Sequence, residues 1–315
     1  MCKFVATIMS SMFKVHILGC GSATPTRRHR PSCQIVDYRG NLLMIDCGEG
    51  AQLEMRRQGL KFSRLSHIFI SHLHGDHVFG LPGLVSTMAL HEKGGRLTIH
   101  TFGEGIKILK PLLDYFCRDT PFEIVWSEVK PGQTMTLLDT PSLTVQSFPL
   151  YHRIPCSGYL FREKPKARHL NGEMIKFFNI TIRDLAALKA GADWTRPDTG
   201  EVIANERLTT PADPSRSYAY CSDTIPSQLV AEAVKGVDLL YHEATYADDN
   251  ACKARPRGHS TAREAGEIAR EAGAGRLMIG HYSKRYKSED ALLEQARETF
   301  GGEVSAADEG LIVEV

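Results

Sequence analysis

The chain has 315 residues with 38 basic and 37 acidic side chains, so its net charge gives no sign of a polyanionic partner. This length is enough to bury a substantial core in one domain. The eight cysteines include no C-x-x-C pair, which excludes a small disulfide framework and is typical of a reducing cytosol. No apolar run approaches the ~20 residues of a membrane span, and we therefore expect a cytoplasmic protein with no membrane partner.

We expect residues 1–12 to be an extension in front of a domain that spans 13–315. The first nine residues are briefly apolar, but no cleavage-type spacer separates them from the first expected strand, as a secretory signal would require. Translation that starts at Met9 or Met12 is an alternative explanation for this segment.

Strand-like runs and helical spacing alternate in both halves of the domain. We expect strands at 13–18, 67–71, 143–148, 218–222, 276–280 and 311–315, and helices at about 79–92, 104–117, 260–272 and 288–299. The segment from about 162 to 210 is polar and mixed in charge, with helical spacing at 181–189, and we expect an inserted arm there. Strands bracketed by helices in both halves predict an α/β (α+β) protein built as an αββα four-layer sandwich.

The run His72-Leu-His74-Gly-Asp76-His77 directly follows the expected strand 67–71. Five of its six positions are metal-ligand types or a glycine, which lets the backbone turn tightly. His72 and His74 can face one cation, while Asp76 and His77 can face a second. A single histidine is usually structural, but three histidines and an aspartate within six residues predict the loop of a two-metal hydrolase.

Two metal ions need more ligands than one loop supplies. Three further candidates, His152, Asp223 and His281, each follow a strand-like apolar run and open a loop. A single His or Asp in such a position is most often structural. Their shared position after strands, together with the 72–77 loop, predicts that they converge at one edge of the sheets.

These motifs resemble those of the metallo-β-lactamase superfamily and, within it, the ribonuclease Z family, whose members remove 3′ trailers from tRNA precursors. The resemblance extends from about Phe13 to the C-terminus. Besides the 72–77 loop, it rests on the phrases Leu18-Gly-Cys-Gly-Ser22, Ile45-Asp-Cys-Gly-Glu-Gly50, Tyr220-Cys-Ser-Asp-Thr224, His242-Glu-Ala-Thr245, His259-Ser-Thr261 and His281-Tyr-Ser-Lys-Arg-Tyr286.

The resemblance implies a metallo-β-lactamase αββα four-layer sandwich with an inserted tRNA-binding arm, a tRNA precursor as substrate, and a homodimer. It also implies two divalent metal ions per subunit. We expect these to be Zn²⁺, although the ligand types also suit manganese or iron. The implied ligands are His72, His74 and His152 for one ion, Asp76, His77 and His281 for the other, and Asp223 as a bridge between them.

The implied activity is that of a metal-dependent endoribonuclease. A hydroxide that bridges the two metal ions attacks the phosphodiester, leaving a 3′-hydroxyl on the tRNA and a 5′-phosphate on the trailer. Asp76 orients the hydroxide, His259 protonates the departing 3′ oxygen, and Glu243 holds the other nitrogen of His259. An alternative explanation for the 259–261 phrase is that Ser260 or Thr261 caps the helix that follows.

Basic residues cluster beside the ligand-bearing loops and in the arm. Each cluster alone is typical of a solvated surface, but together they predict a positive rim that holds phosphates. For the arm, the resemblance implies contact with the body of the tRNA. The rim clusters are Arg27, Arg28 and Arg30, then Lys253, Arg255 and Arg257, then Lys284, Arg285 and Lys287; the arm patch is Arg162, Lys164, Lys166 and Arg168.

Other functions are compatible with parts of this pattern. A small-molecule phosphodiesterase or a glyoxalase-II-like thioester hydrolase would use the same ligands, but the 242–245 and 259–261 phrases favour ribonuclease Z. A non-catalytic tRNA-binding module, which is a different class of function, predicts broken ligand sets, and here none is missing. The sequence leaves open where precursors that encode the CCA end are cut.

Overall fold

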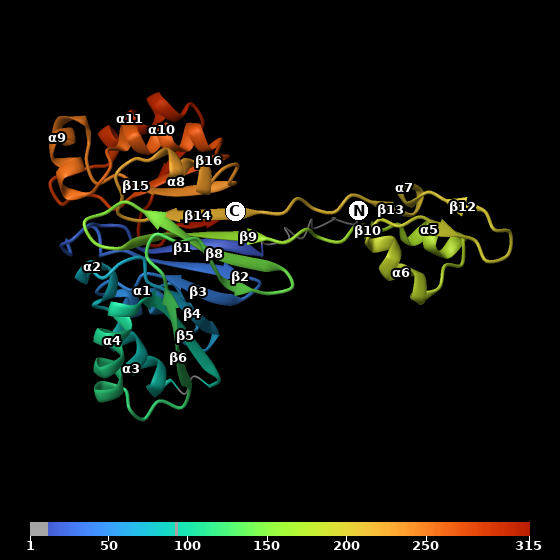
Figure 1. Cartoon of the computed structure of the whole chain (residues 1–315), viewed down its shortest axis with the longest axis horizontal. Coiled ribbons are helices and arrows are strands. Elements are labelled where there is room, and N and C mark those ends of the chain that lie inside the picture. The colour runs from blue at the N-terminus through green and yellow to red at the C-terminus, as the bar shows by residue number, and fades with distance from the viewer. Residues whose placement is uncertain (1–11, 92–93) are drawn as a thin grey trace, which may run out of the picture.

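The computed structural model describes residues 12–91 and 94–315, so the expected N-terminal extension lies, except for Met12, outside the described residues. Two seven-stranded sheets lie face to face (Figure 1). In sheet order, the first consists of β18 (Ile312–Glu314), β1 (Phe13–Gly19), β2 (Cys33–Tyr38), β3 (Asn41–Ile45), β4 (Leu65–Phe69), β5 (Arg96–Phe102) and β6 (Glu123–Val129). The second consists of β17 (Glu303–Ala306), β16 (Arg276–Gly280), β15 (Leu239–Glu243), β14 (Ser217–Cys221), β9 (Cys156–Glu163), β8 (Leu143–Leu150) and β7 (Met135–Asp139).

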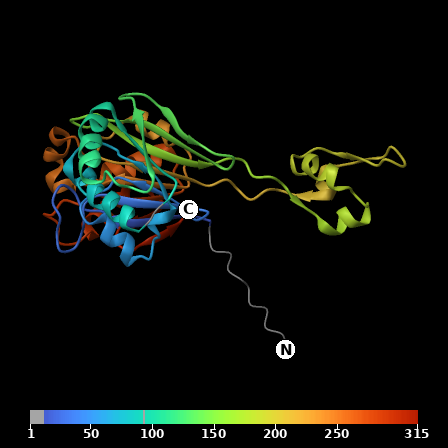
Figure 2. The ribbon, with the colours of Figure 1, turned by 90° about the horizontal axis from the view of Figure 1, so that it is seen from below.

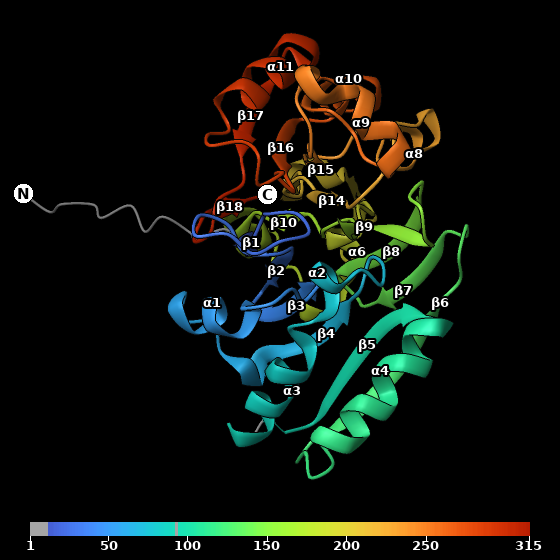
Figure 3. The same ribbon diagram turned by 90° about the vertical axis from the view of Figure 1, so that its left-hand side faces the viewer.

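Helices cover the outer face of each sheet, which completes the four layers (Figures 1 and 3). The first sheet is covered by α1 (Ala51–Arg57), α3 (Leu81–Leu90) and α4 (Gly103–Phe116), and the second by α8 (Gln228–Ala233), α10 (Ala262–Ala272) and α11 (Asp290–Phe300). Short helical segments are α2 (Gly75–Val78), α9 (Ala251–Ala254), η1 (Phe62–Arg64), η2 (Asp248–Asn250) and η3 (Arg255–Arg257). The strands and helices expected in the body from the sequence are confirmed to within two residues at each end.

The alternation of side chains along the strands builds two apolar layers. In β2, Val36 points between the sheets and packs in one core with residues of β9 and β14, whereas Ile35 points outward and packs against α3 and α4. Phe69 of β4 contacts Phe161 of the opposite sheet, with ring centroids 5.7 Å apart. Both sheets are therefore locked together, and the loops at one edge are held by a rigid body.

Residues 164–216 leave the second sheet between β9 and β14 and form a separate lobe, which we call the arm (Figures 1 and 2). The arm contains α5 (Gly172–Phe177), α6 (Ile182–Lys189), α7 (Asn205–Leu208) and the paired short strands β10 (His169–Leu170) with β13 (Thr209–Thr210) and β11 (Trp194–Thr195) with β12 (Val202–Ile203). Its own small core consists of Ile180, Leu188, Trp194, Ile203 and Leu208.

Within the described part of the chain, we find no helix with the length and apolar character needed to cross a membrane.

Candidate metal-dependent active site

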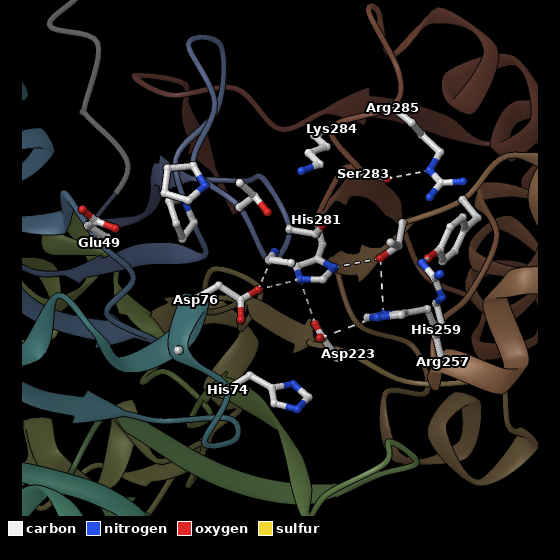
Figure 4. A pocket seen from close by; sticks show the side chains of 18 of the residues that line it. Glu49, His74, Asp76, Asp223, Arg257, His259, His281, Ser283, Lys284 and Arg285 are labelled. Atoms are coloured by element: carbon white, nitrogen blue, oxygen red, sulfur yellow. Dashed lines mark hydrogen bonds and ion pairs between the residues drawn. The ribbon is translucent and has the colours of Figure 1, made fainter.

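Seven side chains converge at one edge of the sandwich, where several strands end, and four of them, His74, Asp76, Asp223 and His281, are labelled in Figure 4. β14, β15 and β16 run parallel, so the loops that follow them meet at the same edge. The loop after β4 brings a further set of side chains to this edge from the opposite sheet. The seven are His72, His74, Asp76 and His77 after β4, His152 after β8, Asp223 after β14 and His281 after β16.

Three histidines and one carboxylate oxygen form the first group of donors. His74 Nδ1 lies 3.0 Å from His72 Nε2 and 3.2 Å from His152 Nε2. Asp223 Oδ2 lies 3.5 Å from His72 Nε2 and 3.8 Å from His152 Nε2. These four atoms therefore surround one point.

The second group lies on the other side of the Asp223 carboxylate. Asp76 Oδ2 is 3.5 Å from His77 Nε2 and 3.6 Å from His281 Nε2. Asp223 Oδ1 is 3.6 Å from His77 Nε2 and 3.1 Å from His281 Nε2. Each oxygen of Asp223 thus faces one group of donors, which is the arrangement that a bridging carboxylate requires.

Several of these donor atoms are buried without a hydrogen bond. Among the described residues, His77 Nε2, Asp223 Oδ1 and His281 Nε2 have no hydrogen-bond partner. A buried polar atom left unpaired costs about 1–3 kcal/mol, and here three of them face each other. Imidazole nitrogens and carboxylate oxygens are the donors that zinc and similar divalent ions bind, so the residues present fit such ions.

The opposite ring nitrogens of four histidines are hydrogen-bonded away from the centre. Each of these partners can accept a hydrogen bond, so the outward nitrogen can carry the ring proton and the inward nitrogen can bind a metal ion. The contacts are His72 Nδ1 to Ser71 Oγ at 3.1 Å, His77 Nδ1 to Asp46 Oδ2 at 2.7 Å, His152 Nδ1 to the Gly258 carbonyl at 2.7 Å and His281 Nδ1 to Thr245 Oγ1 at 2.8 Å.

Asp46 is a buried carboxylate that holds several side chains of the site in place, and the sequence alone assigns it no role. Its Oδ1 accepts from the Ser71 amide at 2.7 Å, and its Oδ2 accepts from Ser71 Oγ at 2.8 Å and from the Tyr220 hydroxyl at 2.9 Å. The signal available in the sequence is an acidic residue directly after the apolar strand β3, within the phrase 45–50. Asp46 fixes His77 from behind, as outer carboxylates do in metal sites.

Backbone conformations with positive φ gather around the site. Asp46, His281 and Ala23 have φ values of 55°, 62° and 45°, a region that residues other than glycine rarely adopt and that recurs at functional sites. The Ala23 amide donates to Asp76 Oδ2 at 2.6 Å. The strained loop thereby holds Asp76 in place.

Burial and neighbouring charges set the protonation states. Burial lowers the pKa of His72, His74 and His152, with the neighbouring histidines acting in the same direction. These rings are therefore neutral, as metal ligation requires. Burial opposes the ionisation of Asp76, but His77 and His281 hold the pKa of its carboxyl well below the usual range.

His259 and Glu243 form a buried ion pair beside the second group. His259 Nδ1 donates to Glu243 Oε1 at 2.9 Å. Although burial opposes both charges, the carboxylate raises the pKa of His259 and the imidazolium lowers the pKa of Glu243. Glu243 is held further by Thr245, whose hydroxyl donates to Oε2 at 2.6 Å. The alternative explanation by helix capping holds for Thr261, which caps α10 in a capping box with Glu264.

The site opens into a cleft of about 970 Å³. Four basic residues line it, namely Arg153, Arg257, Lys284 and Arg285, three of which are labelled in Figure 4. Arg153 is not among the residues predicted from the sequence, although it directly follows His152. Of the other rim residues, Arg27, Arg28 and Lys287 line a neighbouring hollow, while Arg30 pairs with Glu54 at 3.0 Å and Arg255 faces Glu264 at 3.8 Å. Lys253 donates to Asn250 Oδ1.

The basic patch expected on the arm lies at its root, at the far end of β9 from the metal-ligand edge. β9 is eight residues long, so this end is roughly 23 Å from that edge. The residues are largely paired: Lys164 with Asp139 at 2.5 Å, Lys166 with Glu163 at 2.7 Å, and Arg168 with Thr209 Oγ1 at 2.7 Å, while Arg162 is exposed on β9.

Comparison with known proteins finds a relative that is similar over nearly the whole chain. A curated protein of Parabacteroides distasonis named ribonuclease Z is 50% identical over 303 residues, which cover 96% of this chain and 99% of that protein. A family model described as anti-Pycsar protein Apyc1 matches residues 13–109, about the first third of the chain.

Two solved structures are similar in fold. The crystal structure of human tRNase Z, short form, aligns with a TM-score of 0.69 at 24% identity, covering 95% of this chain and 98% of that one. The metallo-β-lactamase fold protein YhfI from Bacillus subtilis aligns with a TM-score of 0.66 at 20% identity, covering 96% and 99%. These likenesses confirm the predicted metallo-β-lactamase fold.

Proposed function

The chain belongs to the ribonuclease Z family, and on that premise we propose that its cleft removes the 3′ trailer from tRNA precursors. The enzyme acts as an endoribonuclease that leaves a 3′-hydroxyl on the tRNA and a 5′-phosphate on the trailer. The observation that carries this mechanism is the Asp223 carboxylate, whose two oxygens face two separate groups of donors.

Two divalent ions fit these groups, and the imidazole and carboxylate donors suit Zn²⁺. His72, His74 and His152 would hold one ion, Asp76, His77 and His281 would hold the other, and Asp223 would be shared between them. Bound there, such a pair lowers the pKa of a water molecule and stabilises negative charge on phosphate oxygens.

Asp76 has a second task as a hydrogen-bond acceptor that orients the attacking water. Its carboxylate stays ionised because His77 and His281 lie beside it, which hold its pKa low against the effect of burial. Its position is fixed by the Ala23 amide. The strain in the Ala23 backbone serves this placement.

His259 supplies the proton for the departing 3′ oxygen. An alkoxide is a poor leaving group, and proton transfer from a positioned side chain contributes roughly 10²–10⁴-fold. Glu243 keeps His259 protonated and fixes the orientation of its ring through the 2.9 Å hydrogen bond. The other ring nitrogen, Nε2, is then left to reach the substrate.

Basic residues of the cleft and the arm bind the RNA. Arg153, Arg257, Lys284 and Arg285 line the cleft and hold phosphates near the scissile bond. The arm extends far from the cleft (Figure 2) and contacts the body of the tRNA. We also propose that the protein is a homodimer. Light scattering on the purified protein tests this: twice the mass of the chain would support a homodimer, and the mass of one chain would refute it.

The experiment that tests the proposed function is single-turnover cleavage of an end-labelled tRNA precursor by wild type, Asp76→Ala and His259→Ala. We expect one cut after the discriminator base, abolished in Asp76→Ala and slowed in His259→Ala. Intact precursor together with hydrolysis of a simple phosphodiester or thioester would refute the tRNA assignment and favour a small-molecule hydrolase.

A further inference from the structure

A second cluster of metal-binding side chains lies outside the cleft, between the loop 20–30 and the turn after β17. His29 Nδ1 lies 2.9 Å from Glu309 Oε2 and 3.3 Å from Cys20 Sγ. Cys20 Sγ lies 3.7 Å from the same carboxylate oxygen. A thiol and an imidazole from the loop 20–30 and a carboxylate from the turn after β17 thus point at one another, and all three side chains are largely buried.

The spacing of these atoms is close to that of a metal site. In a tetrahedral zinc site with ordinary bond lengths, neighbouring N, O and S ligands are roughly 3.3–3.6 Å apart. The three distances here span 2.9–3.7 Å, which is close to the 3.0 and 3.2 Å found among the histidines of the cleft. Asp308 stands beside them, with Oδ1 3.8 Å from His29 Nδ1, and can take a fourth position.

The outer nitrogen of His29 is arranged as in a ligating histidine. His29 Nε2 lies 3.0 Å from Glu289 Oε1, and the other oxygen of Glu289 pairs with Arg28 at 2.6 Å. A carboxylate on the outer nitrogen fixes the ring and leaves the inner nitrogen to bind a metal ion. The same device holds His77 in the cleft through Asp46.

The charge around the cluster also favours a cation. The carboxylates of Glu289, Asp308 and Glu309 lie 2.9–3.8 Å from the nitrogens of the His29 imidazole, and Glu289 also pairs with Arg28. Burial raises the pKa of the Cys20 thiol well above its usual range, and the carboxylates add to this effect. A bound cation offsets the charge of these carboxylates and displaces the thiol proton to solvent, because only the thiolate binds metals well.

We propose that Cys20, His29 and Glu309, with Asp308 in the fourth position, form a structural site for one zinc-class divalent ion, separate from the ions of the cleft. The site ties the loop 20–30 to the C-terminal turn. It is also coupled to the cleft, because Tyr282 donates its amide to the Cys20 carbonyl at 3.0 Å and is next to His281. An ion there stabilises the loop that contains Ala23, whose amide donates to Asp76 Oδ2.

Cobalt substitution tests this site without relying on activity. The cleft donors include no cysteine, so a thiolate-to-Co²⁺ charge-transfer band in the near ultraviolet reports on Cys20. We expect the Co²⁺-loaded wild type to show this band and to bind one equivalent more than its cleft holds. Cys20→Ser should lose the band and one equivalent, and Glu309→Gln should bind that equivalent at least about tenfold more weakly.

Two controls make the result decisive. Cys252→Ser removes an exposed cysteine elsewhere and should keep the band, and His72→Ala with His77→Ala, which breaks the cleft, should also keep it. A wild type without the band, or a band that survives in Cys20→Ser, would overturn the proposal. If Cys20→Ser fails to fold by circular dichroism, unchanged Co²⁺ affinity in Glu309→Gln would overturn it instead.

Discussion

The cleft and the arm handle charge in opposite ways. In the cleft, the histidines and carboxylates of the candidate metal site are largely buried, and several are held by a second group: His77 by Asp46, His281 by Thr245 and His259 by Glu243. In the arm, most charged side chains are exposed, and the lobe packs around a small core of five buried apolar residues.

This difference follows from the tasks that we propose for the two regions. Phosphodiester cleavage needs donors fixed to a fraction of an ångström, and only a rigid body with two locked sheets supplies this precision. Binding the body of an RNA needs positive charge and reach, which exposed lysines and arginines on a projecting lobe supply. Substitutions in the cleft should therefore affect the rate of the chemical step, and those in the arm the affinity.

The largest effect is expected from Asp223→Ala. It removes the carboxylate shared by both groups of donors, so single-turnover cleavage should fall below detection for a tRNA precursor and for a simple phosphodiester alike. Asp213→Ala is the matched control, because Asp213 is an exposed aspartate of the arm segment that pairs only with His169 among the described residues. Comparable loss of activity in both variants would contradict the distinction between the two regions.

His259→Ala should slow single-turnover cleavage by about 10²–10⁴-fold, with precursor affinity unchanged. The defect should vanish on a precursor whose departing 3′ oxygen is replaced by sulfur, because a thiolate leaves without a proton. His169→Ala, in the arm, should cleave both substrates at the wild-type rate. A His259→Ala defect of equal size on the sulfur substrate would rule out the acid role.

A smaller effect is expected from removing the free positive charge of the arm. Lys176, Arg183 and Lys189 are exposed and have no acidic partner among the described residues, so the triple change to Gln should weaken precursor binding. It should also make the salt dependence of binding shallower by up to about 2 units of logarithmic slope.

Changing Lys164 and Lys166 to Gln provides the comparison within the arm. Both already pair with carboxylates, so their loss should change affinity and salt slope less than the triple variant does. Equilibrium binding at several salt concentrations measures both sets, and a larger effect of the paired lysines would place the RNA contact at the root of the arm.

The smallest effect is a pH dependence of stability that arises in the body. Burial, with a minor contribution from His67, lowers the pKa of His100 to about 3. The unfolded chain binds this proton near pH 6.5, so the neutral folded form contributes stability above that pH and loses it as the pH falls toward 3. Between pH 7.5 and 5.5 this loss is about 1 kcal/mol.

Urea unfolding at the two pH values checks this expectation. His100→Gln should lose less stability on acidification than wild type, by about 1 kcal/mol. His169→Gln, which removes an exposed arm histidine, should follow the wild type. An unchanged pH dependence in His100→Gln would show that His100 is not the responsible group.

The parts of the site that lie close together in the sequence are the parts that the sequence predicts best. The 72–77 loop places four donors within six residues after an apolar strand, so its chemistry can be predicted without a fold. His152, Asp223 and His281 are isolated in the sequence; their positions after strands predict that they converge, and the family resemblance implies which ion each would bind. The strands and helices of the body could be predicted equally well, because their apolar periodicity matches their burial.

The family resemblance implies the contact of Glu243 with His259, but most supporting contacts could not be predicted, because they join distant segments through side-chain geometry. Asp46 reaches His77 across 31 positions, and Glu309 reaches His29 across 280. The arm illustrates the same limit. Its root residues are basic in sequence, but their charge is offset by Asp139 and Glu163, which periodicity and spacing do not reveal.

The most direct test of the central claim is anomalous diffraction at the zinc edge from crystals of the zinc-loaded protein. We expect two peaks in the cleft on either side of the Asp223 carboxylate, one among His72, His74 and His152 and one among Asp76, His77 and His281. No peak in the cleft, or a single peak that Asp223 does not touch, would contradict the account of a bridged two-metal site.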